Sequence, residues 1–409
     1  MPGKRQGDRG KKIRRILAAG LLLVMFPGKP AAADGTDDVG IRMDQAFRNH
    51  KTIGAAVVVA RDGEIVYEHY YGSAVAKTRE PVTEDTYFRL ASVTKMVTAV
   101  RVMQLVEQGK LALDQDISEI LGYQVRNPYY RKTPVTLRML MTHTSSLDPH
   151  GGYSRESSTL RSLISTDRMK KGNWYQEVPG SVYRYSNFGA GIMGSLMECA
   201  TGMNIDRNAA ENVFGPLGIT ASYSAGLLPD PENIPYLYNP DGTLADARAK
   251  STGKPWDEEP DPDRHYRITV GSLWMRPADL CRIGMMLCDG GETGGERLLQ
   301  AETVREMMDE QCGKGGITAR TPYGLCIHHE TTLLKGKTLY GHQGLSDGIL
   351  CSIYYDPETR FVFVLCSNGC HNLMENRVAH LTRKVFETAW KAFGEKKGGT
   401  SARETAGGT

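Results

Sequence analysis

Residues 90–109 read LASVTKMVTAVRVMQLVEQG, the most informative stretch of this sequence. Apolar residues recur there at steps of three and four, and Gly109 ends the pattern, so we expect a helix. Ser92 stands at the start of this helix, and Lys95 follows on the same face. A serine at a helix start lies beside unpaired backbone N–H groups and the positive end of the helix dipole. This position suits a serine that attacks a carbonyl group.

The Ser-x-x-Lys pattern alone leaves two interpretations open. In the first, Ser92 caps the helix and Lys95 is a solvated charge. In the second, the Lys95 amine activates the Ser92 hydroxyl as a nucleophile. The pattern arises about once by chance in a chain of this composition. Indeed Ser251 and Lys254 repeat it in a stretch rich in Gly, Pro and Asp. Partner motifs must therefore decide between the two interpretations.

Two further motifs follow in chain order. Residues 185–187 read Tyr-Ser-Asn and precede a second helical pattern at 188–201, whereas residues 342–344 read His-Gln-Gly and precede two β-like runs. Together with Ser-x-x-Lys, this series resembles the active-site motifs of the serine β-lactamase and penicillin-binding protein superfamily. Within it, the motifs are most similar to the class C β-lactamase and D-alanyl-D-alanine carboxypeptidase branch. The resemblance also covers 136–147, which ends His-Thr-Ser-Ser-Leu, and runs from about residue 40 to about residue 390.

The resemblance implies roles for the matched residues. It implies that Tyr185 shares proton transfer with Lys95, and that Asn187 orients Lys95 or the substrate amide. It also implies an oxyanion hole formed by the backbone N–H groups of Ser92 and Leu345. A lysine at its ordinary pKa near 10.4 carries its proton at neutral pH, so burial must lower that pKa before Lys95 can act as a base. The sequence does not apportion the base role between Lys95 and Tyr185.

The third motif departs from the family pattern. Gly344 would let the strand approach the substrate, and Gln343 stands in the substrate-binding position where a Thr is common. His342 replaces the usual Lys, as a polar or positive edge of the site or as a hydrogen-bonded structural histidine. Both departures speak against efficient hydrolysis of β-lactams.

The remaining pattern predicts an α/β (α+β) fold. Strands are expected at both ends of the chain and mostly helix and loop between them, which suggests an antiparallel sheet flanked by helices, built from both termini, with an inserted helical lobe. The expected segments are strands at 54–60, 64–71, 348–355 and 360–367, a helix at 373–393, a sheet lobe at 34–90 and about 300–393, and a helical lobe at about 91–299.

The two ends of the chain differ from the rest. Residues 1–33 have a basic start, an apolar run and Ala31-Ala-Ala33, as a signal peptide does, which predicts an exported protein in the periplasm, at the cell surface or outside the cell. This segment holds eight basic residues and one acidic residue, so its removal changes the net charge from +3 to −4. A mature chain of this charge gives no sign of nucleic-acid binding, and no stable membrane span is expected. Residues 394–409 resemble a disordered tail.

Eight cysteines invite a disulfide interpretation in an exported chain. Most of them lie in apolar runs, which favours free thiols, although Cys351 and Cys366 are expected on neighbouring strands. No Cys/His spacing suggests zinc, and neither a metal nor a cofactor is expected.

The sequence thus predicts an exported serine hydrolase that forms an acyl-enzyme on Ser92. Its expected substrates are amides or esters of peptidoglycan-type D-peptides, β-lactams or related small molecules. An esterase without β-lactam activity and a non-catalytic penicillin-binding sensor are the alternatives, and the oligomeric state stays open. Ser346 lies in a G-x-S-x-G pattern at 344–348, but a β-like run follows it where an α/β-hydrolase has a helix.

Overall fold

The computed structural model describes residues 36–155, 157–168, 171–247, 259–312, 322–371 and 373–395. The predicted signal peptide, the second Ser-x-x-Lys pattern and nearly all of the predicted tail lie outside these ranges. Within them, seven strands form one antiparallel sheet, in the order β11-β12-β13-β14-β1-β2-β3. The strands are β1 (Gly54–Arg61), β2 (Glu64–Val75), β3 (Glu80–Pro81), β11 (His328–Glu330), β12 (Leu339–Ser346), β13 (Ile349–Asp356) and β14 (Phe361–Ser367).

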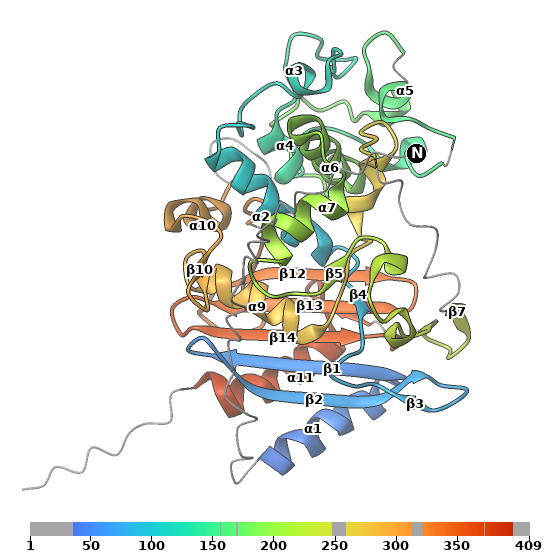
Figure 1. Cartoon of the computed structure of the whole chain (residues 1–409), viewed down its shortest axis with the longest axis vertical. Helices are drawn as coiled ribbons and strands as arrows, with labels where there is room; N and C mark the ends of the chain where they lie inside the picture. The colour runs from blue at the N-terminus through green and yellow to red at the C-terminus, as the bar shows by residue number, and fades with distance from the viewer. Residues whose placement is uncertain are drawn as a thin grey trace, which may run out of the picture. The chain divides into compact units, whose positions relative to one another are not determined.

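The sheet joins the two ends of the described chain, as predicted. β1 from the N-terminal part pairs with β14 from the C-terminal part, and both hairpins, β1–β2 and β13–β14, occur where the sequence predicts them. Asp62 and Gly63 make the tight β1–β2 turn, with φ of 53° and 85°. The sheet is flanked by helices, which confirms the predicted fold class (Figure 1).

Helices cover both faces of this sheet (Figure 1). α1 (Thr36–Asn49) and α11 (His380–Ala389) pack against each other and against one face, whereas α9 (Pro277–Cys288) packs on β1, β13 and β14 from the other. Because both faces are covered, β13 and β14 are buried at every position, which explains their continuous apolar runs.

The inserted part of the chain is mostly helical. Its long helices are α2 (Val93–Glu107) and α6 (Asn187–Thr201), close to the predicted ranges. α2 lies between strands β12 and β13 on one side and α6 and the 3₁₀-helix η6 (His265–Val270) on the other. The shorter helices of the inserted part are α3 (Ile117–Leu121), α4 (Leu137–Met141), η1 (Pro149–Gly151), α5 (Leu160–Ile164), η2 (Lys171–Asn173), α7 (Ile205–Ala209), the π-helix η3 (Ala210–Phe214), η4 (Ala225–Leu227) and η5 (Pro231–Asn233). The short strands there are β4 (Phe88–Arg89), β5 (Ala221–Ser222), β6 (Leu237–Tyr238), β7 (Leu244–Asp246), β8 (Trp274–Met275), β9 (Glu292–Thr293) and β10 (Glu296–Arg297).

Glycines let α6 and η6 approach each other closely. A Cβ on Gly191 would lie 1.9 Å from the backbone oxygen of Tyr266, and one on Gly194 would lie 2.9 Å from the Thr269 side chain. This contact fixes the start of α6, where the Tyr-Ser-Asn motif ends, relative to η6.

Two segments differ from the prediction. Residues 374–379 form a hairpin of β15 (Met374–Glu375) and β16 (Val378–Ala379), so the helix predicted at 373–393 begins only at His380 and ends in the π-helix η7 (Trp390–Gly394). α9 lies inside the range predicted as the helical lobe, yet it packs on the sheet. The next helix along the chain is α10 (Ala301–Met308).

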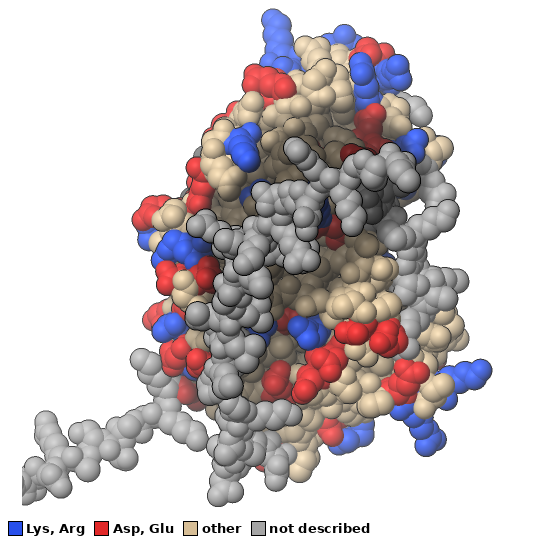
Figure 2. Space-filling view, in the orientation of Figure 1, with Lys and Arg blue, Asp and Glu red and all other residues tan. Residues whose placement is uncertain are grey.

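All eight cysteines are free in the structure, as the apolar surroundings suggested, and Cys199 is the exposed one. Cys351 and Cys366 are direct partners in the β13–β14 ladder, with 3.3 Å between their sulfur atoms. In the described part of the chain, no helix is both long enough and apolar enough to cross a bilayer. On the face seen in Figure 2, acidic and basic side chains are interspersed over the described surface.

Candidate active site

Ser92 stands at the N-cap of α2 but does not cap the helix. Its backbone dihedral angles are already helical, and its hydroxyl accepts no hydrogen bond from the first turn. The Oγ atom instead accepts a hydrogen bond from Lys95 Nζ at 3.0 Å and is hydrogen-bonded to Tyr185. Of the two interpretations that the sequence left open, the structure therefore favours the one in which Ser92 and Lys95 act together. Ala91, just before Ser92, has a φ of 46°, a strained value for a residue with a side chain.

Lys95 is fully buried, and within the described part of the chain it forms no ion pair with a carboxylate. Its Nζ atom donates to Ser92 Oγ and to the backbone oxygen of Val270, 2.7 Å away in η6. Burial lowers the pKa of Lys95 to about 7, and the buried thiol of Cys326 acts in the opposite direction. A substantial fraction of Lys95 is thus neutral at physiological pH, so its amine is able to take a proton from Ser92.

Tyr185 is the second proton-transfer candidate. Its ring lies 5.3 Å from Lys95 Nζ, and its hydroxyl is hydrogen-bonded to Ser92. Burial raises the pKa of Tyr185, and the bond to Ser92 opposes this only in part. Tyr185 thus keeps its proton at neutral pH and is equipped to donate a hydrogen bond rather than to act as a phenolate base.

Asn187 begins α6, directly after the N-cap residue Ser186. Its side chain is hydrogen-bonded to the Tyr153 hydroxyl, while its buried Oδ1 atom has no hydrogen-bond partner among the described residues. The sequence suggested that Asn187 orients Lys95 or the substrate amide. In this structure Lys95 donates to Ser92 and Val270, and the Asn187 side chain binds Tyr153 instead.

The edge of β12 lies against the start of α2. β11 pairs with β12 only as far as Gly341, so the following residues of β12 extend past it. A Cβ on Gly344 would lie 2.2 Å from the backbone oxygen of Leu90 and 3.0 Å from the backbone nitrogen of Ser92. Only glycine allows this approach, which brings the strand segment that contains Leu345 beside Ser92. The Leu345 side chain is more than one-third exposed.

His342 lies inside the protein rather than at the edge of the site. It is fully buried, its Nδ1 atom lies 2.8 Å from the backbone oxygen of Gln343, and its ring centroid lies 4.1 Å from that of His328. Burial, together with the neighbouring His328 and Lys95, lowers the pKa of His342 well below its ordinary value. His342 is therefore neutral at pH 7, and the positive edge that the sequence suggested is not supplied by this residue.

Gln343 faces the β15–β16 hairpin. Its Nε2 atom donates to the backbone oxygen of Arg377 at 3.2 Å, and its Oε1 atom accepts from the backbone nitrogen of Ala379 at 2.9 Å. Its neighbours along the strand, His342 and Gly344, project toward the opposite face, because side chains alternate along a strand. Gln343 thus holds a neighbouring hairpin in place, and its amide is engaged there rather than with a substrate.

The structure adds three residues to which the sequence analysis gave no role. The backbone oxygen of Val270 binds Lys95, and no sequence signal marks a carbonyl group. His143 is buried, and its ring centroid lies 4.3 Å from that of Tyr185. Tyr323 is buried beside His143, with 3.1 Å between its hydroxyl and His143 Nε2. The resemblance of residues 136–147 to a family stretch was the one signal that could have singled out His143.

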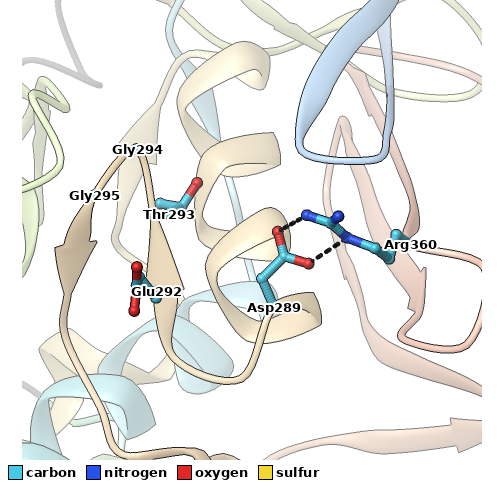
Figure 3. A pocket seen from close by; sticks show the side chains of 6 residues that line it. All are labelled: Asp289, Glu292, Thr293, Gly294, Gly295 and Arg360. Atoms are coloured by element: carbon cyan, nitrogen blue, oxygen red, sulfur yellow. Dashed lines mark hydrogen bonds and ion pairs between the residues drawn. The ribbon is translucent and has the colours of Figure 1, made fainter.

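A separate surface depression of about 450 Å³ is lined by Asp289, Glu292, Thr293, Gly294, Gly295 and Arg360. Arg360 points across it and makes a two-pronged ion pair with Asp289, with both N···O distances 2.8 Å (Figure 3). None of the predicted site residues lines this depression. Within the described ranges, no group of three or more His, Cys, Asp or Glu side chains is arranged to hold a metal ion.

Comparisons with known proteins identify the family of this chain. The family model described as Beta-lactamase matches residues 41–385. Esterase EstB of Burkholderia gladioli is 33% identical over 206 residues, which cover 47% of this chain and 52% of that protein. Penicillin-binding protein 4 of Amycolatopsis lactamdurans is 28% identical over 332 residues, which cover 80% of this chain and 84% of that protein.

A solved structure has the same fold. The D-amino acid amidase from Ochrobactrum anthropi SV3 superposes with a TM-score of 0.66 at 21% identity, over 88% of this chain and 99% of that chain. At this identity the likeness concerns the fold alone. The family model, in contrast, spans most of the chain, including all three motifs. The chain therefore belongs to the β-lactamase family and is an enzyme of the serine hydrolase type.

Proposed function

We propose that this protein hydrolyses small esters or amides through an acyl-enzyme on Ser92, with Lys95 as the base. One observation carries the proposal: Ser92 Oγ lies 3.0 Å from a fully buried amine whose pKa is lowered to about 7. An amine near this pKa combines a populated neutral form with enough basicity to deprotonate a hydroxyl group. A helix cap would explain neither the buried lysine nor the uncapped first turn.

The proposed acylation needs no group from outside this chain and its substrate. Neutral Lys95 takes the Ser92 proton as Oγ attacks the carbonyl carbon, and the carbonyl oxygen gains the negative charge. The backbone N–H groups of Ser92 and Leu345 are the proposed donors to this oxyanion. When the bond to the leaving group breaks, protonated Lys95 returns the proton through the Tyr185 hydroxyl. A water molecule then attacks the acyl-enzyme, with the same groups acting in reverse, and releases the acid.

Substrates without an obligatory carboxylate fit the site best. His342 is buried and neutral, and the amide of Gln343 is bound to the β15–β16 hairpin, so neither supports recognition of a β-lactam carboxylate. The relative named esterase EstB agrees with this preference. We therefore propose ester or simple amide hydrolysis ahead of β-lactam hydrolysis. Export is also proposed, on the strength of the basic, apolar and small-residue pattern at 1–33.

A labelling experiment tests the proposal with a matched control. The mature protein, Ser92→Ala and Ser346→Ala are each incubated with a fluorescent penicillin and, separately, with p-nitrophenyl acetate. Ser346 is an exposed serine at the β12–β13 turn, in the G-x-S-x-G pattern. We expect ester hydrolysis by the wild type and by Ser346→Ala, and a loss of at least about 10³-fold in Ser92→Ala.

Each other outcome changes the conclusion in a defined way. Equal hydrolysis by Ser92→Ala and the wild type would refute the acyl-enzyme on Ser92. Penicillin label that forms and clears would identify β-lactam turnover and contradict the proposed preference. Stable label without ester hydrolysis would identify a penicillin-binding sensor.

A further inference from the structure

A group of buried and half-buried histidine and tyrosine side chains lies around Tyr185. Its members are His143, Tyr183, Tyr185, Tyr323, His328 and His342, which are linked by ring contacts with centroid distances of 4.1 to 6.4 Å. Only Tyr185 and His342 were predicted to belong to the site. Buried polar groups are costly unless they are hydrogen-bonded, so the hydrogen-bond partners of His143 and Tyr323 indicate why these two are there.

Backbone partners fix the tautomers of two of these histidines. The backbone N–H of Ser186 donates to His143 Nδ1 at 3.2 Å, so in the neutral ring the proton is on Nε2. The backbone oxygen of Gln343 can only accept, so His342 carries its proton on Nδ1, 2.8 Å away, and its Nε2 atom is an acceptor.

The Tyr323 hydroxyl connects the two rings. It lies 3.1 Å from His143 Nε2, which donates to it, and 3.5 Å from His342 Nε2, to which it donates. All four hydrogen bonds therefore point the same way, from the Ser186 N–H to the Gln343 carbonyl oxygen. We call these three side chains the Tyr323 relay: His143, Tyr323 and His342.

The relay ends within two of the three active-site motifs. Ser186 lies between Tyr185 and Asn187, and Gln343 lies between His342 and Gly344. Between the two ends, the His143 ring packs against the Tyr185 ring with 4.3 Å between centroids. His143 also has a φ of 56°, a strained conformation that is held by its surroundings. A shift of the relay would therefore move the Tyr185 ring relative to Ser92.

We propose that Tyr323 is a positioning residue, whose hydroxyl locks the Tyr-Ser-Asn segment to β12 and so holds Tyr185 in place for proton transfer. This inference rests on the proposed acyl-enzyme mechanism. Tyr323→Phe keeps the ring and its packing but removes the only hydroxyl of the relay. It leaves His143 Nε2 without its acceptor and His342 Nε2 without its donor, so each ring keeps only its backbone hydrogen bond and is held less firmly.

A double-mutant cycle on kcat tests this role. We expect Tyr323→Phe to lower kcat for p-nitrophenyl acetate about 10- to 100-fold, with KM changed by less than about twofold. If Tyr323 acts by positioning the Tyr185 hydroxyl, then removing the Tyr323 hydroxyl has no further effect in a protein that already lacks the Tyr185 hydroxyl. The double variant Tyr185→Phe/Tyr323→Phe should then have the kcat of Tyr185→Phe alone. If Tyr323 had only a structural role, the fold-losses in kcat of the two single variants would multiply in the double variant. That result would overturn the proposal.

Two further variants serve as a control and as an alternative to Tyr323→Phe. Tyr355→Phe is the matched control, because the buried Tyr355 hydroxyl has no hydrogen-bond partner in the part of the chain that the structure describes. We expect it to have wild-type kinetics. His143→Asn keeps an acceptor for the Ser186 N–H but is too short to reach Tyr323. His143→Asn should lower kcat as much as Tyr323→Phe does, and it should cause no further loss of kcat when combined with Tyr185→Phe. The proposal therefore remains testable if Tyr323→Phe does not fold. Wild-type kcat in His143→Asn would overturn the proposal.

A measurement without turnover separates this inference from the proposed function. Nitrogen-15 NMR of the histidine side chains reports which ring nitrogen carries the proton. We expect Nε2–H for His143 and Nδ1–H for His342 in the wild type. In Tyr323→Phe the Ser186 N–H still selects the same His143 tautomer, but the Nε2 resonance should shift because its acceptor is gone. Other tautomers in a protein that still acylates Ser92 would refute the relay and leave the proposed function intact. Failure of acylation with these tautomers present would refute the proposed function alone.

Discussion

The Ser92 side chain lies at the start of a helix but takes part in the candidate active site instead of capping the helix. Its position has the sequence of an N-cap, yet its hydroxyl is bound to Lys95 and Tyr185. Non-glycine residues with a left-handed backbone stand next to each of these three groups. They are Ala91 before Ser92, His143 against Tyr185, and Cys326 near Lys95, with φ of 46°, 56° and 57°. Such strain costs about 1–3 kcal/mol per residue and is typical of functional sites.

The pH dependence of acylation should follow the Lys95 amine. Because burial lowers the pKa of Lys95 to about 7, its neutral base form is populated above that pH and lost below it. We therefore expect kcat/KM for a neutral ester to rise tenfold per pH unit below about 7 and to level off above. The raised pKa of Tyr185 predicts no fall up to pH 9. A stopped-flow pH profile measures this, and a midpoint above 9 would contradict Lys95 as the base.

At the scale of elements, one glycine brings the β12 edge to the nucleophile. Gly344→Ala would place a methyl group 2.2 Å from the Leu90 backbone oxygen, so β12 must move away from the start of α2. We expect an acylation rate at least about 100-fold lower, as for the loss of one oxyanion donor, with Ser92 still in place. Burst kinetics with p-nitrophenyl acetate measure the effect.

Gly172→Ala is the control for this prediction. Gly172 is exposed, and a Cβ there would meet no atom within 4 Å. It should acylate at the wild-type rate. Equal rates for Gly344→Ala and Gly172→Ala would show that the β12 contact is not needed.

Local sequence predicted the long elements better than the short ones. α2, α6 and both hairpins have periodic apolar patterns over seven or more residues, and they lie where the patterns indicate. The β15–β16 hairpin was missed, because its turn residues Asn376 and Arg377 include no glycine although both have a positive φ. Its position is fixed by the distant Gln343, which binds the backbone of Arg377 and Ala379.

At the scale of the whole molecule, the buried amine should cost stability. Unfolded Lys95 binds a proton below its ordinary pKa near 10.4, whereas folded Lys95 binds one only below about 7. Between these values the unfolded chain holds the extra proton, so the free energy of unfolding rises with pH. From pH 7.5 to 9.5 we expect the wild type to gain about 2–3 kcal/mol more than Lys95→Met.

Urea unfolding at the two pH values measures this difference. Lys95→Met should also be inactive and, at pH 7.5, more stable than the wild type, because it removes a buried ionisable group. Lys110→Met changes an exposed lysine and should keep the wild-type pH dependence. If Lys95→Met and the wild type gain equal stability between pH 7.5 and 9.5, the buried amine does not have a lowered pKa.

The sequence by itself determined the family, the fold class and the order of the three motifs, because motif spacing and apolar periodicity are local properties of the chain. It also located Ser92 and Lys95 one helical turn apart. Tertiary structure decided what each group can do. Burial under η6 lowers the pKa of Lys95, burial within the Tyr323 relay keeps His342 neutral, and strand alternation turns Gln343 to the far face. Burial and contacts between distant segments decide these properties: Val270 lies 175 positions from Lys95 and Arg377 lies 34 positions from Gln343, so no local pattern contains them.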